Sequence, residues 1–236
     1  GLMPNAQRLM LKLFSKLPKA LLVKLAGGSP IEIRGRVLDP MMQVLSVEGK
    51  KQPPITDATP EQARAVMDEA AGLLSGPMPS GLTIVDRTIP GPVGDISIRV
   101  YRPQNSDSSP VVLFFHQGGF VIGGLETCHA FCALVAREAE CVVINVDYRL
   151  APEHPFPAAV EDALAAYEWT LKNASELGGD SNRIAVCGDS AGGMLAALIC
   201  QEAKRRNWQA PVGYVLIYPL LVPHSRLPFY TDFGDA

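Results

Sequence analysis

The sequence predicts an α/β fold in which a largely parallel sheet is flanked by helices. Two observations support this fold class. Short apolar runs rich in β-branched residues alternate with helical patterns along residues 111–218. Several runs, such as residues 111–115, are apolar at every position, as expected of strands covered on both faces. Strands and helices in this alternating order predict parallel strands joined by right-handed crossovers.

Length and composition narrow the class of protein. The chain has 236 residues, of which 47% are apolar, enough for one α/β domain with a smaller appendage. A net charge of −3 gives no reason to expect nucleic-acid binding. Five cysteines, mostly inside apolar segments, favour a reducing compartment, and we expect a cytoplasmic protein. No run of 18 apolar residues is present, so no membrane span is expected.

The first 80 residues show helical periodicity and are predicted to form an N-terminal helical cap. Residues 8–25 are amphipathic, with lysines on one face and leucines on another, and Pro18 interrupts the pattern. This segment favours a lid packed over the main domain, but its basic face leaves open weak association with a membrane surface. Further helices are predicted at 41–47 and, beginning with a Thr59 capping box, up to residue 74.

Residues 81–236 are predicted to form the sheet-containing core. After Gly81 the period changes from that of a helix to the alternation of a strand. Residues 82–89 and 96–101 are predicted to pair through a turn at 91–94. The remaining predicted elements are, in order, strand 111–115, helix 126–137, strand 141–146, helix 157–172, strand 184–187, helix 194–200 and strand 212–218.

The sharpest motif lies where the predicted strand 184–187 meets the helix that follows it. Residues 188–192 read Gly-Asp-Ser-Ala-Gly, a G-x-S-x-G pentapeptide. Between a strand and a helix, this motif holds its serine on a strained, exposed turn, and the helix N-terminus behind it offers free N–H groups to an oxyanion. The bland alternative is a glycine-rich turn without chemistry. The flanking elements favour Ser190 as a nucleophile.

A second glycine-rich loop follows the central strand 111–115. It reads His116-Gln-Gly-Gly-Phe120. Adjacent glycines allow backbone N–H groups to approach a substrate oxygen without a Cβ atom in the way. Gly118 and Gly119, together with the N–H of Ala191, are therefore candidate donors to a tetrahedral intermediate.

The chain resembles bacterial esterases of the hormone-sensitive-lipase family, a branch of the α/β-hydrolase fold. Three pieces carry the resemblance, namely residues 116–120, the stretch Asp-Tyr-Arg-Leu-Ala-Pro-Glu-His-Pro-Phe-Pro-Ala at 147–158, and Gly-Asp-Ser-Ala-Gly-Gly at 188–193. The resemblance implies a nucleophile at Ser190, an oxyanion hole at Gly118, Gly119 and Ala191, and a role for His116 in ordering the loop. It implies a small ester of short-to-medium acyl chain as substrate. The sequence shows no metal-ligand cluster, so we expect no metal and no cofactor.

Other histidines and cysteines are not expected to be functional. His129 lies on a predicted helix, and His154 lies in a segment that the resemblance marks as a structural loop. Asp147 and Arg149 of this loop should be hydrogen-bonded or paired. Cys128 and Cys132 have metal-like spacing, but no second ligand pair accompanies them, and we expect core packing.

The chain departs from the family in two respects. Gln117 stands where the family usually has glycine, which can reshape the loop. The triad acid and histidine, which in this fold follow the serine along the chain, are not found by residue 236, and Asp232 and Asp235 are poor candidates for the acid. Because the apolar run 212–218 suits a strand inside a sheet, we expect the functional protein to contain two more strands and a helix.

Three alternatives stay open at this point, one of which is a lipid-surface protein that uses the basic N-terminal helix. The same scaffold can serve as a non-catalytic small-molecule receptor, since fold alone does not decide function. The chain can also be an inactive fragment, because a serine without its base is a weak nucleophile. A homodimer is left open as well.

Overall fold

The computed structural model describes residues 13–14, 16–51, 54–104 and 107–221. By their internal contacts these residues form two units, one ending at Thr59 and the other comprising Pro60–Leu221. Asp232 and Asp235, and the start of the amphipathic segment 8–25, lie outside the described residues.

The first unit is a small helical assembly. Its core contains Leu22, Ala26 and Val44. The buried Gln43 ties its parts together, because its amide nitrogen donates to the carbonyl oxygens of Ala26 (3.1 Å) and Ser29 (2.8 Å). The amphipathic pattern begins a new helix directly after Pro18, as the proline predicts. The elements are α2 (Lys19–Leu25), β1 (Glu32–Ile33), β2 (Arg36–Val37), α3 (Pro40–Gly49) and η1 (Ile55–Asp57).

The helix predicted at 41–47 is α3, and its start has a clear local cause. The carboxylate of Asp39 accepts from the backbone N–H of Met41 at 2.9 Å, and proline occupies the first helical position. Both features satisfy or remove N–H groups that a helix start leaves unpaired. The short antiparallel pair β1–β2 was not predicted.

The second unit is built on a six-stranded sheet in the described part of the chain, with the order β3-β4-β6-β5-β7-β8. β3 and β4 form the predicted hairpin, and β4 also runs antiparallel to β6. The pairs β5–β6, β5–β7 and β7–β8 are parallel. The strands are β3 (Leu82–Pro90), β4 (Asp95–Pro103), β5 (Ser109–Phe115), β6 (Val142–Asp147), β7 (Gly179–Asp189) and β8 (Gly213–Ile217).

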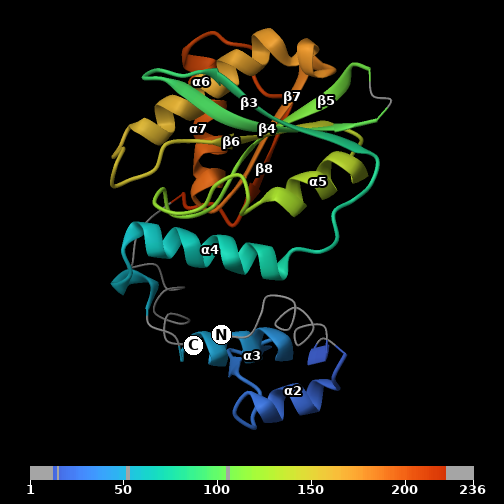
Figure 1. The fold of residues 1–236 in the computed structure, drawn as a ribbon, viewed down its shortest axis with the longest axis vertical. Helices are drawn as coiled ribbons and strands as arrows, with labels where there is room; N and C mark the ends of the chain where they lie inside the picture. The colour runs from blue at the N-terminus through green and yellow to red at the C-terminus, as the bar shows by residue number, and fades with distance from the viewer. Residues whose placement is uncertain (1–12, 15, 52–53, 105–106, 222–236) are drawn as a thin grey trace. The chain divides into compact units, whose positions relative to one another are not determined.

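Helices cover both faces of this sheet (Figure 1). On one face, α6 and α7 bury residues such as Tyr167 and Ile199 against Leu113 and Ile184. On the other face, α5 buries Cys132 and its neighbours against strand residues that include Phe114. The predicted α/β architecture, with a largely parallel sheet between helices, is confirmed. The helices are α4 (Pro60–Leu74), α5 (His129–Glu138), α6 (Ala158–Asn173), η2 (Ala174–Leu177) and α7 (Ala191–Arg205).

The helix α4 belongs by its contacts to the same unit as the sheet. The division that the sequence suggests at residue 80 would instead place α4 with the N-terminal segment. At the other end of the unit, β8 is the last strand in the sheet order, and Tyr214 and Val215 on it are 64% and 56% exposed. Among the described residues, no helix combines the length and apolar character that crossing a bilayer requires.

Candidate active site

Ser190 is the single residue between β7 and α7. The strand ends at Asp189 and the helix begins at Ala191, three residues earlier than the sequence indicates. The backbone of Ser190 has φ 51° and ψ −113°, a region that a residue with a side chain rarely adopts. Such a conformation costs about 1–3 kcal/mol and persists only where its surroundings enforce it. The strained turn expected of a G-x-S-x-G motif is present.

The last strand holds this turn in place. The Ser190 N–H donates to the carbonyl of Ile217 at 2.9 Å. The Ser190 carbonyl accepts from the N–H groups of Met194 (3.2 Å) and Leu220 (3.1 Å). Because β8 and the residues after it occupy both backbone groups of Ser190, they supply the constraint that the strained conformation needs.

The loop after β5 forms a tight turn beside the serine. Phe115, the last residue of β5, is the register partner of Gly188 on β7, so the loop and Ser190 leave the same edge of two neighbouring parallel strands. The N–H groups of Val121 and Ile122 both donate to the carbonyl of Gly118 at 3.0 Å. A Cβ atom on Gly118 would lie 1.9 Å from the Ile122 carbonyl oxygen, and its φ of +128° also requires glycine.

Gln117 fits this loop without strain. It is absent from the residues with positive φ, so the backbone here accepts a Cβ atom. The glycine that the family usually has at this position is therefore not needed for the turn. Within residues 116–120, positive φ is instead adopted by Gly118, Gly119 and Phe120.

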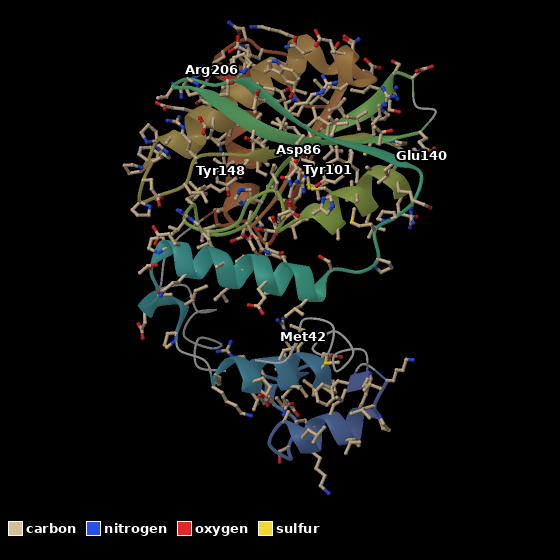
Figure 2. All side chains as sticks on the ribbon, in the orientation of Figure 1. Met42, Asp86, Tyr101, Glu140, Tyr148 and Arg206 are labelled. Atoms are coloured by element: carbon tan, nitrogen blue, oxygen red, sulfur yellow. The ribbon has the colours of Figure 1, made fainter. Side chains whose placement is uncertain are left out.

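His116 is fully buried beneath the loop. Its Nδ1 lies 2.7 Å from the Gln117 carbonyl, its ring stacks on Tyr148 at 4.2 Å, and the Tyr148 hydroxyl donates to the His116 carbonyl at 2.6 Å. Figure 2 shows Tyr148 inside the unit that contains the sheet. Burial lowers the pKa of His116 to about 4, so the imidazole is neutral near pH 7. A neutral ring that donates from Nδ1 to a loop carbonyl is suited to holding the loop.

Asp189, next to the serine, is a buried carboxyl group that the sequence did not single out as functional. Its Oδ2 accepts from the Tyr218 hydroxyl at 3.2 Å, and its Oδ1 has no partner among the described residues. Burial raises the pKa of this carboxyl. The contact adds a side-chain bond between the serine turn and the segment after β8.

Structural contacts account for three residues that are not expected to be functional, namely His129, Cys128 and Cys132. His129 begins α5, and its Nδ1 lies 2.9 Å from the Tyr101 hydroxyl and 3.2 Å from Arg99 Nη1. Cys128 and Cys132 are buried in the hydrophobic cluster under α5, as expected of core residues. In the part of the chain that the structure describes, no cluster of three or more potential metal ligands occurs.

The loop after β6 is held by an ion pair, as predicted for Arg149. Its guanidinium contacts Asp162 on α6 through Nη2 (2.8 Å) and Nε (2.9 Å), and its backbone N–H donates to the same carboxylate at 2.9 Å. The Asp162 side chain is only 1% exposed. A buried carboxylate with this many donors fixes the path of the chain after β6.

A cavity of about 640 Å³ lies between α4 and α5. Gln117 and Phe131 are among its lining residues, whereas Ser190 is not. Because Gln117 belongs to the loop after β5, the cavity adjoins that loop, while Ser190 lies outside its lining.

Comparisons with known proteins agree with this geometry. A family model described as the alpha/beta hydrolase fold matches residues 112–233. The chain belongs to the α/β-hydrolase family, in its hormone-sensitive-lipase-like branch of esterases. The expected family and fold are thus confirmed.

The similar proteins are esterases by name. The carboxylic ester hydrolase LipN of Mycobacterium tuberculosis is 40% identical over 207 residues, which cover 83% of this chain and 54% of LipN. The carboxylesterase NlhH of the same species is 46% identical over 143 residues, covering 60% of this chain and 45% of NlhH. This chain spans about half the length of these curated relatives.

Solved structures give the same result. The carboxylesterase EstE1, cloned from a metagenomic library, is 40% identical with a TM-score of 0.71, over 77% of this chain and 62% of EstE1. An esterase of Pyrobaculum calidifontis is 43% identical with a TM-score of 0.65, over 69% of this chain and 54% of that protein.

Proposed function

We propose that this chain carries the nucleophile and oxyanion hole of a carboxylic-ester hydrolase. The observation that supports this most directly is the strained Ser190 between β7 and α7, beside the glycine loop of the adjacent strand. The family and the names of the similar proteins point the same way. They favour a hydrolase over the alternative of a non-catalytic receptor.

In the proposed reaction, the Ser190 hydroxyl oxygen attacks the ester carbonyl and the alcohol leaves with a proton. Water then attacks the acyl-enzyme, releasing the carboxylic acid and regenerating the hydroxyl. The N–H groups of Gly118, Gly119 and Ala191 stabilise the negative oxygen of each tetrahedral intermediate. His116 orders the loop and does not transfer the proton, since it is buried and bonded to the Gln117 carbonyl.

A chromogenic butyrate ester tests the proposal on the full-length gene product. Replacing Ser190 with alanine should lower kcat by about 10⁶-fold, the usual effect of losing a catalytic serine. Ser175→Ala, at an exposed serine in η2, is the matched control and should retain the full rate. Equal rates for wild type and Ser190→Ala would remove Ser190 from its role.

The finer parts of the proposal concern the setting of the enzyme. We propose short-to-medium acyl esters as substrates, residues 1–80 as a cap and a cytoplasmic location. All five cysteines are free thiols, which supports a reducing compartment. Rates on a series of esters of increasing acyl length test the substrate preference. Deletion of the N-terminal helices tests the cap, and cell fractionation tests the cytoplasmic location. A homodimer stays a prediction that sedimentation can test.

A further inference from the structure

Arg64 connects three separate parts of the chain through one guanidinium group. It lies on α4, where Nε donates to the Val121 carbonyl at 2.9 Å and Nη2 donates to the Ala151 carbonyl at 3.0 Å. Nη1 and Nη2 also bind the two carboxylate oxygens of Glu153 at 2.9 and 2.7 Å. This arrangement uses the planar fork of arginine, which lysine does not reproduce.

The carbonyl of Val121 belongs to the turn that shapes the candidate oxyanion loop. The N–H of the same residue donates to the Gly118 carbonyl, so Val121 is held by Gly118 on one side and by Arg64 on the other. The neighbouring Phe120 carbonyl accepts from the Ala151 N–H at 2.8 Å. The loop after β5 and the loop after β6 are therefore bonded directly and share Arg64 as a common donor.

We propose that Arg64 is a positioning residue for the oxyanion loop, acting through the carbonyls of Val121 and Ala151. This inference rests on the proposed function, because the loop positions a substrate only if the chain cleaves esters. The ion pair with Glu153 aims the guanidinium. The side chain of Arg64 is 26% exposed and that of Glu153 is 43% exposed, so this ion pair contributes little to the stability of the fold. The two carbonyl bonds carry the effect on the loop.

Kinetics of the full-length gene product on the butyrate ester test the inference. For Arg64→Ala we expect kcat to fall by about 10- to 100-fold with KM changed less than about twofold, because small displacements of oxyanion donors are costly in the transition state. Arg64→Lys should recover only part of the loss. Glu153→Gln removes the charge pair but leaves the carbonyl bonds in place, and it should lose less activity than Arg64→Ala.

Hydrogen–deuterium exchange provides a readout that does not depend on activity. In Arg64→Ala, amides in the peptide covering residues 117–123 should exchange at least about tenfold faster, whereas those of β5 should not change. The control is Arg205→Ala, which removes an exposed arginine paired with Glu202 on α7. It should alter neither kcat nor exchange in the loop.

The outcomes separate the two proposals. Unchanged exchange at 117–123 together with unchanged kcat in Arg64→Ala would overturn the positioning role. A uniform rise in exchange across the sheet would also overturn it, since that would show general destabilisation. If Ser190→Ala retained full activity, the proposed function would fail, while the exchange data would still decide whether Arg64 holds the loop.

Discussion

The carbonyl oxygen of Phe115 approaches Gly192 so closely that a Cβ atom on Gly192 would lie 1.9 Å from it. Phe115 ends β5, and Gly192 is the second residue of α7. The contact therefore sets how near the helix behind Ser190 comes to the start of the loop with Gly118 and Gly119. The position of a Cβ atom on Gly192 is set by the backbone, and the Phe115 oxygen is itself a backbone atom. No side-chain rotation can therefore relieve the clash.

Gly192→Ala should therefore destabilise the protein. Backbone has to shift at the end of β5 or the start of α7, and we expect a loss of at least about 2 kcal/mol in the free energy of unfolding. Urea unfolding followed by circular dichroism measures it. The control is Gly72→Ala on α4, where a Cβ atom meets nothing within 4 Å, and alanine should be neutral or stabilising. Equal stability of the two variants would contradict the argument.

The two glycines of the oxyanion loop should respond differently to alanine. At Gly118 the added Cβ would lie 1.9 Å from the Ile122 carbonyl oxygen, so the turn must open and its N–H must move. We expect kcat to fall by at least about 10²-fold, the effect of losing one oxyanion donor. At Gly119 the φ is +60° and nothing lies within 4 Å, so alanine costs only about 1–2 kcal/mol of backbone strain. Initial rates on the butyrate ester should rank Gly119→Ala well above Gly118→Ala, and the reverse order would be inconsistent with these contacts.

Much of the fold was predictable because the burial of each element determines the spacing of apolar residues along the sequence. Strand β5 reads as apolar on both faces because helices cover both, and the β3–β4 hairpin alternates because its two faces differ. For α7, the sequence pattern predicts a start three residues later than the observed Ala191. The run Ala191-Gly-Gly193 looks unfavourable for a helix by intrinsic propensity, but close packing against Phe115 and Pro219 requires glycine there.

The interactions around the candidate site were less predictable because they join distant parts of the chain. Arg64 lies 57 residues from Val121 and 89 from Glu153, and an arginine on an amphipathic helix looks like an ordinary surface residue. Asp162 also lies in a helical pattern. Its buried carboxylate is explained only by the ion pair with Arg149, which comes from the loop after β6. Local sequence carries no sign of such pairings.

Asp162→Ala should cost about 3 kcal/mol in the free energy of unfolding, because it breaks a buried pair and leaves the partner charge without its carboxylate. Glu161→Ala is the matched control. Glu161 contacts the same Arg149 at 3.4 Å from the neighbouring position on α6, but its side chain is 47% exposed, so its loss should cost less than about 1 kcal/mol. Chemical denaturation of both variants measures the difference. Similar losses of stability in the two variants would show that burial of the carboxylate does not determine the cost of removing it.

His116 should stay neutral until well below its usual range. Burial lowers its pKa from 6.5 in the unfolded chain to about 4 in the folded protein, so between these values only the unfolded state binds the proton. The free energy of unfolding contributed by this group is complete above pH 6.5 and decreases as the pH falls, by about 3 kcal/mol at pH 4. Nuclear magnetic resonance of ¹⁵N-labelled histidine should show the His116 ring in its neutral form, with one ring nitrogen protonated, at pH 5. A midpoint near pH 6.5 would mean that the ring is open to solvent, in which case it could not hold the Gln117 carbonyl as the buried hydrogen bond requires.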